Sequence, residues 1–300
     1  MDRLRSELHP GPVVDGRRAH APSARWRRRT ERLLVSKGER EEAGVEWLLA
    51  QQHPPTRPNV VAVVSPKGGV GKTTSTYVIG GLLADRLRLR VVAVDANPDF
   101  GTLASLAPDR LRSHLSLADV FAQLEQLHTA TQLRAYVSAL PTGLHLLGAP
   151  SDAAAMAELG VGAYGELVAL LDTFYDLVLL DLGTGVASEL AQFALRRADQ
   201  AVLVTTPEFV TSSVVLAAFE HLEHEHTTVV CNKFYARGPG DLSELERRLR
   251  ERRLHQSIAI PHDEQLAGML DTATYELDAL ERPTRMAVKR LGLQVAEQLV

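Results

Sequence analysis

The sequence predicts a three-layer α/β protein with a mostly parallel central sheet and helices on both faces. From residue 59 onward, short apolar runs alternate with longer segments of helical character, the pattern of repeated strand–helix units. The apolar runs contain almost no polar residue, as expected of strands that are buried on both sides. The strands are expected at 60–64, 91–95, 144–147, 177–181, 201–205, 229–232 and 257–260. Ligands of such sheets bind at the carboxyl ends of the strands, so the polar residues there are the candidates for function.

The composition indicates an ordinary globular protein. Of 300 residues, 45% are hydrophobic, but no apolar run approaches the ~18 residues of a membrane span, and no signal peptide opens the chain. Integral membrane insertion is therefore not expected. A single cysteine, Cys231, excludes an internal disulfide and fits the reduced cytoplasm, where we expect the protein to reside.

Residues 1–57 are expected to form a basic, partly disordered N-terminal extension, followed by one domain at 58–300. Through Pro58 the chain has 12 basic and 8 acidic residues, although its overall net charge is −4. Short helices are expected at 23–35 and 39–51, and prolines at 54, 55 and 58 then indicate a linker. Three interpretations remain open: a solvated tail, a docking element for an unidentified protein partner, or a segment that binds an anionic membrane or nucleic acid.

A glycine-rich turn at 65–74 separates the first expected strand from a helix expected at 75–88. Its glycines allow the backbone to fold into a nest whose N–H groups point at an anion, and the helix dipole adds to that attraction. Lys72 would reach the phosphates of a nucleotide, and the Thr73 hydroxyl would ligate Mg²⁺. The residues expected to bind the nucleotide here are Lys67, Gly68, Gly69, Val70, Gly71, Lys72, Thr73 and Thr74.

The motif departs from the general phosphate-binding loop at one position. Pro66 stands where a glycine is usual, and a second lysine, Lys67, follows it. The resulting Lys-Gly-Gly-x-Gly-Lys-Thr-Thr resembles the deviant Walker P-loop ATPases of the MinD and ParA type. The resemblance implies a homodimer when ATP is bound, in which Lys67 crosses the interface to the phosphates of the other subunit's ATP. A charge supplied in trans is worth about 10³–10⁵ in the rate of phosphoryl transfer.

Two aspartates end the second and the fourth of the expected strands. Asp95 and Asp181 both follow expected strands, and an aspartate at this place in P-loop proteins orients Mg²⁺. Thr184 and Gly185 replace the Pro-Gly pair that relatives carry after the second aspartate, so this switch matches the family only in part. The expected catalytic residues are Lys67, Lys72, Asp95 and Asp181, and the expected Mg²⁺ ligands are Thr73, Asp95 and Asp181.

The first switch departs further from the family. Relatives commonly carry Asp-x-Asp-Pro, but the second aspartate is here Asn97, whose amide carries no charge and is no base. Asp95 or Asp99 would have to compensate, so we expect ATP binding with slow hydrolysis. The run Asp-Ala-Asn-Pro-Asp-x-Gly-Thr-Leu, paired with the Gly-Thr-Gly switch, resembles MinD-like ATPases linked to actinobacterial type VII secretion.

The choice of base depends on two strand ends. Asn232 follows a strand and is similar to the family's asparagine that reads the adenine edge, the alternative being a plain turn residue. Tyr235 stands where a guanine-type Asn-Lys-x-Asp signature would place an aspartate, which favours ATP. The resemblance also implies that the segment after the last strand packs against adenine. Its residues are Pro261, His262 and Asp263.

These patterns lead to two hypotheses of different class. The first is an ATP-binding, slowly hydrolysing dimeric switch that positions or regulates cellular machinery, in a secretion-associated or partition-like role. The second is an ATP-dependent docking or DNA-binding protein with little or no turnover. The charged segment 244–253 is interpreted as a solvated helix face, with non-specific DNA contact as the alternative. A helix expected at 283–300 places Val288, Leu291, Val295 and Leu299 on one face. Relatives of the MinD type continue past this helix into an amphipathic membrane anchor, whereas this sequence stops there, so we expect a core helix.

Overall fold

The computed structural model describes residues 36–97, 101–150, 152, 160–218, 224, 226–235, 242–252, 254 and 256–300. The helix expected at 23–35 and the aspartate at position 99 lie outside these residues. The chain divides into two units, Met1–Glu41 and Glu42–Val300. The sheet and the site described below belong entirely to the second unit.

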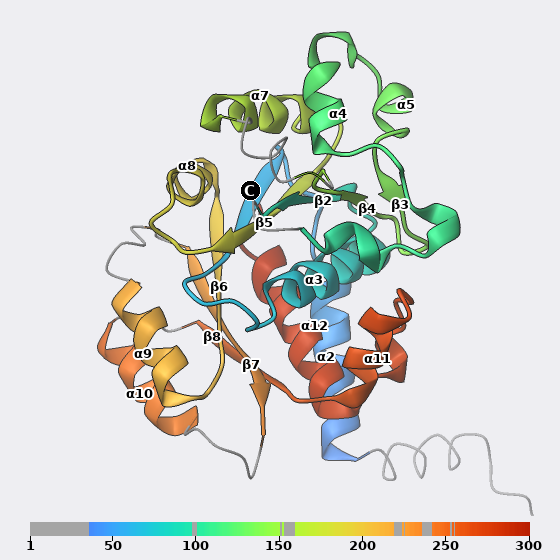
Figure 1. Ribbon diagram of the computed structural model, residues 1–300. Helices are drawn as coiled ribbons and strands as arrows, with labels where there is room; N and C mark the ends of the chain where they lie inside the picture. The colour runs from blue at the N-terminus through green and yellow to red at the C-terminus, as the bar shows by residue number, and fades with distance from the viewer. Residues whose placement is uncertain are drawn as a thin grey trace, which may run out of the picture. The chain divides into compact units, whose positions relative to one another are not determined.

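The second unit is built on an eight-stranded sheet with the order β3-β4-β2-β5-β1-β6-β7-β8 (Figure 1). All neighbouring strands are parallel except β3 and β4, which pair antiparallel. The strands are β1 (Asn59–Ser65), β2 (Val91–Ala96), β3 (Ser138–Ala139), β4 (Leu144–Leu147), β5 (Leu177–Thr184), β6 (Gln200–Thr205), β7 (Thr227–Phe234) and β8 (Ser257–Pro261). The seven expected strands are confirmed, and the two-residue strand β3 is an addition at the edge. The predicted fold class is confirmed.

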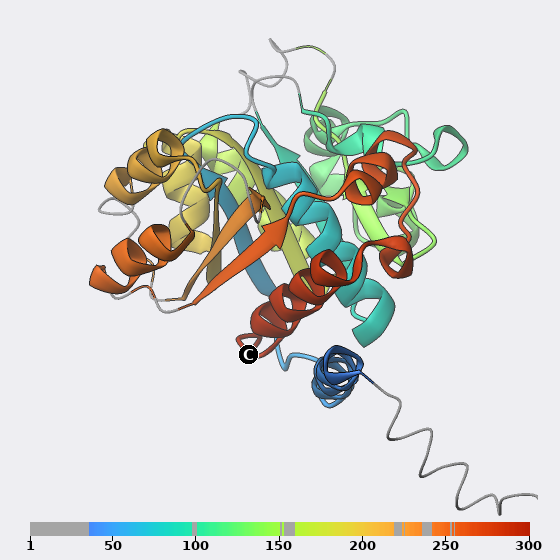
Figure 2. The same ribbon diagram turned by 90° about the horizontal axis from the view of Figure 1, so that it is seen from below.

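Helices cover both faces of the sheet (Figures 1 and 2). Along β1, Val61 and Val63 pack into one core cluster and Val60, Ala62 and Val64 into another, because successive side chains of a strand point to opposite faces. The first cluster includes residues of α2 (Lys37–Ala50), α3 (Lys72–Leu87), α11 (Glu264–Asp271) and α12 (Arg282–Ala296). The second includes residues of α4 (Leu117–Ala122), α5 (Ala130–Leu133), α7 (Val161–Leu171), α8 (Glu189–Arg197), α9 (Phe209–Ala218) and α10 (Leu242–Glu251).

The last helix, α12, is a core element as expected. Val288, Leu291 and Val295 are fully buried, and the helix lies beside α3 in Figure 2. No helix within the described ranges combines the length and the apolar character that crossing a bilayer requires.

An ion network joins α2 to α12. The Glu42 carboxylate accepts from Arg285 Nε at 2.6 Å and from Lys289 Nζ at 3.0 Å, and Leu49 is 1% exposed within the first core cluster. The Arg285 hydrogen bond, followed by the pull of Lys289, lowers the pKa of Glu42 to about 2 despite its partial burial. Residues 42–50 therefore pack as part of the second unit, although the prolines after them suggested a linker.

Candidate functional site

The glycine-rich turn lies between β1 and α3, at the carboxyl edge of the sheet. Gly69 and Gly71 have φ of 74° and 101°, the left-handed region that glycine enters without strain. Gly71 is the N-cap of α3 and brings no side-chain cap to the helix. The amides of residues 68 to 74 donate to no acceptor within the described part of the chain. Unpaired amides at the positive end of a sixteen-residue helix form a site for an anion.

Two residues at the end of β7 brace this turn. The Asn232 side-chain amide, 4% exposed, donates to the Val70 carbonyl oxygen at 2.9 Å, and the Lys233 ammonium donates to the Gly69 carbonyl at 2.8 Å. A Cβ at Gly71 would lie 2.0 Å from the Asn232 amide nitrogen, so a glycine is required there. The expected adenine contact of Asn232 stays a prediction, while its bond to the turn is a role that sequence analysis missed. Its position at the end of a strand marked Asn232 as a candidate, but did not predict that it would bond to the Val70 carbonyl.

Lys72, Thr73 and Asp181 meet beneath the turn. Burial lowers the pKa of Lys72, and the charge of Asp181 opposes that shift. Burial raises the pKa of Asp181 to about 7, partly offset by a hydrogen bond from Thr73, while the neighbouring Asp95 adds to the rise. Asp181 is 2% exposed, and its Oδ1 has no hydrogen-bond partner among the described residues.

These groups fit a magnesium ion. Mg²⁺ prefers oxygen ligands and keeps much of its water, so one or two protein oxygens beside a phosphate are enough. The unpaired Asp181 Oδ1 and the neighbouring Thr73 hydroxyl are such oxygens. A buried carboxylate oxygen without a partner costs free energy unless a ligand binds it, so the arrangement favours a cation.

Asp95 has a different environment, although it pairs in register with Asp181 across β2 and β5. Its Oδ2 accepts from the Leu103 amide at 2.9 Å and its Oδ1 from the Asn97 amide at 3.4 Å. Burial raises the pKa of Asp95 to about 6 against these bonds. A Cβ at Gly101 would lie 2.2 Å from Asp95 Oδ2, so the loop can close on the carboxylate only with glycine there. Asp95 thus holds its own loop, and its expected catalytic and metal roles stay predictions.

Lys67 is exposed and bonded within its own chain. Its Nζ donates to Thr211 Oγ1 at 2.8 Å, and that hydroxyl donates to Glu208 Oε2 at 3.1 Å. The Thr206 hydroxyl also donates to Glu208, at 2.6 Å. This bond, then that of Thr211 and the charge of Lys67, lower the pKa of Glu208. Thr206, Glu208 and Thr211 were not named as site residues from the sequence. Their place directly after β6 was a signal, because ligands bind at the carboxyl ends of the strands.

The segment after β8 approaches the end of β7. The His262 ring stacks on Tyr235 with ring centroids 4.5 Å apart, and the His262 amide donates to the Phe234 carbonyl at 2.8 Å. Asp263 caps α11 by accepting from the Gln265 amide at 2.8 Å, and its other oxygen accepts from the Glu281 amide at 3.0 Å. The Asp263 carboxylate is therefore used inside the fold. Contact of Pro261, His262 and Asp263 with adenine stays a prediction.

Neither the Cys231 thiol nor the charged helix α10 forms part of this site. Cys231 is 1% exposed, and burial raises the pKa of its thiol to about 12, so it is an inert core group. On α10, the Arg247 guanidinium bonds to Glu244 and Glu251 of the same helix, while Leu249 is buried. The arginine charge on this helix is largely balanced by carboxylates of the same helix.

Comparison with known proteins gives the class. The AAA_31 family model, described as an AAA domain, matches residues 58–228, which is more than half of the chain. The chain belongs to this family and is a MinD/ParA-type P-loop ATPase. The fold agrees with a ParA family ATPase from Chlorobium tepidum TLS, with a TM-score of 0.66 at 19% identity over 78% of this chain and 98% of that one.

Two further proteins are similar to this chain. The MinD protein of Pyrococcus horikoshii OT3, solved with Mg-ADP, has a TM-score of 0.64 at 19% identity over 78% of this chain and 94% of that one. ESX-1 secretion-associated protein EspI of Mycobacterium tuberculosis (strain H37Rv) is 35% identical over 148 residues, 49% of this chain. That match spans 22% of the length of EspI. The chain is thus similar to only a part of that protein.

Proposed function

We propose that this protein binds ATP with Mg²⁺ at the β1–α3 turn and acts as a dimeric, slowly hydrolysing switch. One observation carries the proposal: the backbone amides of residues 68–74 and the Asp181 Oδ1 atom all lack hydrogen-bond partners at the same edge of the sheet. The amides and Lys72 would hold the phosphates, and Thr73 and Asp181 would hold the ion. Mg²⁺ would neutralise charge on the phosphates during transfer.

Dimerisation is proposed from the position of Lys67. Its side chain is exposed and held by one hydroxyl, Thr211 Oγ1, so a stronger anionic partner would draw it away. The phosphates of an ATP bound to a second subunit would be such a partner. In this proposal, ATP binding exchanges the bond to Thr211 for a contact across the interface.

Slow turnover is proposed from the loop that follows β2. Asn97 supplies an amide instead of a carboxylate, and both oxygens of Asp95 accept from the loop backbone. We therefore assign neither group as an efficient base for the attacking water. The same observations favour the second candidate, an ATP-dependent docking protein with little or no turnover.

Single-turnover hydrolysis at saturating ATP separates these two functions. The switch predicts slow, complete hydrolysis that Lys67→Ala abolishes, together with a dimer that forms in a non-hydrolysable ATP analogue. Lys37→Ala, at an exposed lysine outside the site, is the matched control and should behave as the wild type. Tight ATP binding without any hydrolysis supports the docking protein, and absence of Mg²⁺-ATP binding overturns both.

The target of the switch is proposed to be a protein that contacts the N-terminal extension, in a secretion-associated or partition-like process. The similarity to EspI supports the first setting, and the basic leader supports a docking role. Co-purification in ATP should recover a partner with the full chain and lose it when residues 1–35 are deleted, a cut that leaves α2 in place. ATP-dependent, salt-sensitive retention on non-specific duplex would indicate DNA as the target instead.

A further inference from the structure

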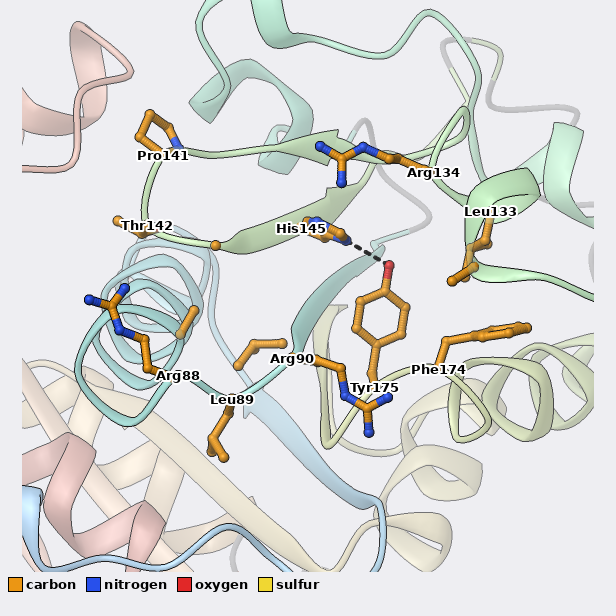
Figure 3. A pocket seen from close by; sticks show the side chains of 14 residues that line it. Arg88, Leu89, Arg90, Leu133, Arg134, Pro141, Thr142, His145, Phe174 and Tyr175 are labelled. Carbon is orange, nitrogen blue, oxygen red and sulfur yellow. Dashed lines mark hydrogen bonds between the residues drawn. The ribbon is translucent and has the colours of Figure 1, made fainter.

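A cavity of about 410 Å³ lies at the amino edge of the sheet. Its lining comes from the starts of β2 and β4, from the turn before β5 and from α5 (Figure 3). The glycine-rich turn follows the carboxyl end of β1, so the six residues of β2 separate the two edges by roughly 20 Å. The cavity is therefore distinct from the nucleotide site, and its volume lies within the roughly 300–1,000 Å³ typical of small-molecule sites.

The charge around this cavity is positive. Three arginines and a histidine line it, and no acidic residue does. Arg90 is neutralised by Asp176, to which its Nε donates at 3.1 Å, and Arg88 lies 4.0 Å from Asp85. Arg134 is exposed at the rim of the cavity and forms no ion pair with any residue that the structure describes. A cation without a counter-charge beside a cavity favours an anionic ligand.

A polar pair lies in the middle of the cavity lining. His145 Nδ1 and the Tyr175 hydroxyl are 2.8 Å apart, as the dashed line in Figure 3 shows, and Tyr175 is 5% exposed. Burial, reinforced by the charge of Arg134, lowers the pKa of His145, so its ring is neutral near pH 7. Burial also raises the pKa of Tyr175, which therefore keeps its proton. If Tyr175 donates to Nδ1, the imidazole carries its proton on Nε2 and can donate it to a ligand.

The remaining walls are apolar and partly aromatic. Leu89 and Leu133 are buried, and Phe174 lies on the same side of the view as Leu133 (Figure 3). Such walls favour a flat, uncharged body, because apolar area removed from water contributes about 25 cal/mol per Å². The positive charge and the apolar walls together favour a ligand that has an anionic group and an apolar body.

We propose that this cavity binds a small organic anion, a carboxylate or a phosphate monoester on a flat apolar group. Arg134 faces the negative charge, the His145–Tyr175 pair supplies a neutral donor, and Leu133 and Phe174 flank the apolar body. The site goes beyond the proposed ATP switch and does not depend on it.

Ligand-observed NMR on the full chain tests the proposal with benzoate and phenyl phosphate as probes. Both should bind saturably, and the tighter of the two identifies the anion type. Benzyl alcohol, which lacks the charge, and inorganic phosphate, which lacks the apolar body, should bind at least about tenfold more weakly. Equal binding of benzyl alcohol, or no saturable binding of either anion, overturns the proposal. Excess Mg²⁺-ATP should leave the probe bound, and displacement would show that the probe occupies the nucleotide site.

Two variants assign the binding to this cavity. Arg134→Gln should weaken both anions about tenfold, because a charge-assisted hydrogen bond is lost. Arg110→Gln, at an exposed arginine outside the lining, is the matched control and should bind as the wild type. Tyr175→Phe keeps the ring but removes the hydroxyl, and should weaken binding severalfold. A cooperative melting curve would show that this variant is folded. Unchanged affinity in Arg134→Gln would overturn the proposal.

Discussion

Asp95 and Asp181 lie opposite each other on neighbouring strands, and both pKa values are raised by burial, yet the two carboxylates are used differently. Asp95 has both oxygens bonded to the loop that follows it, whereas Asp181 keeps one oxygen without a partner. The difference shows that position at a strand end does not fix a role. A carboxylate satisfied by its own backbone stabilises a loop, and one left unsatisfied is available to a ligand.

The largest expected effect comes from Asp181→Asn. It should weaken Mg²⁺-dependent ATP binding about 10–100-fold, because an amide is a poorer Mg²⁺ ligand and orients the ion's water less well. The free protein should be no less stable at pH 8, since the variant removes a buried charge whose Oδ1 had no partner. Nucleotide titration with and without Mg²⁺, beside a melting curve, measures both. Unchanged Mg²⁺ dependence would remove Asp181 from the metal site.

Gly101→Ala tests the other carboxylate. The new methyl would lie 2.2 Å from Asp95 Oδ2, so the loop must open, at about 1–3 kcal/mol in the free energy of unfolding. Gly268→Ala, within helix α11 and with nothing near its added methyl, is the control and should be neutral or stabilising. Chemical denaturation of both variants decides the matter. Equal stability of Gly101→Ala and the wild type would show that the loop does not close on Asp95.

A pH series sharpens the comparison at Asp181. Its folded pKa is raised to about 7, so the carboxyl is protonated at lower pH and must lose that proton to bind Mg²⁺. Mg²⁺ affinity at saturating nucleotide should therefore fall about tenfold per unit as pH drops below 7, and level off above it. Asp181→Asn is the control, because in this variant the side chain no longer titrates and only the nucleotide does. A wild-type profile identical to that of the variant would contradict the assignment.

The smallest expected effect concerns the two loop lysines. Lys72 is half-buried beside Asp181, whereas Lys67 is exposed and bonded to Thr211. Thr211→Val removes that acceptor at similar volume, and a hydrogen bond worth about 0.5–1.5 kcal/mol should shift ATP-dependent dimerisation toward the dimer by about 2–10-fold. Light scattering in a non-hydrolysable analogue measures the shift. A weaker dimer would mean that Thr211 supports the interface instead of competing with it.

Much of the fold could be predicted from the sequence. Strand positions could be predicted from apolar runs, since a strand that is buried on both faces is apolar at nearly every position. β3 was not predicted, because a strand of two residues is too short to show a pattern of apolar and polar residues. Its pairing with β4 is decided by tertiary contact. The helix at Lys37–Ala50 was expected within a residue or two at each end, but its attachment through Glu42 to Arg285 and Lys289 joins residues more than 240 positions apart.

The sequence by itself determined the phosphate-binding turn, because a nest of amides needs only glycines and a helix start that are adjacent in the chain. It also determined which carboxylates stand at strand ends. Only the tertiary structure decided that Asp95 closes its own loop, that Asn232 braces the turn, and that Lys67 is held by Thr211. Those bonds are short-range and directional, so they form only once the parallel strands bring distant segments to one edge of the sheet.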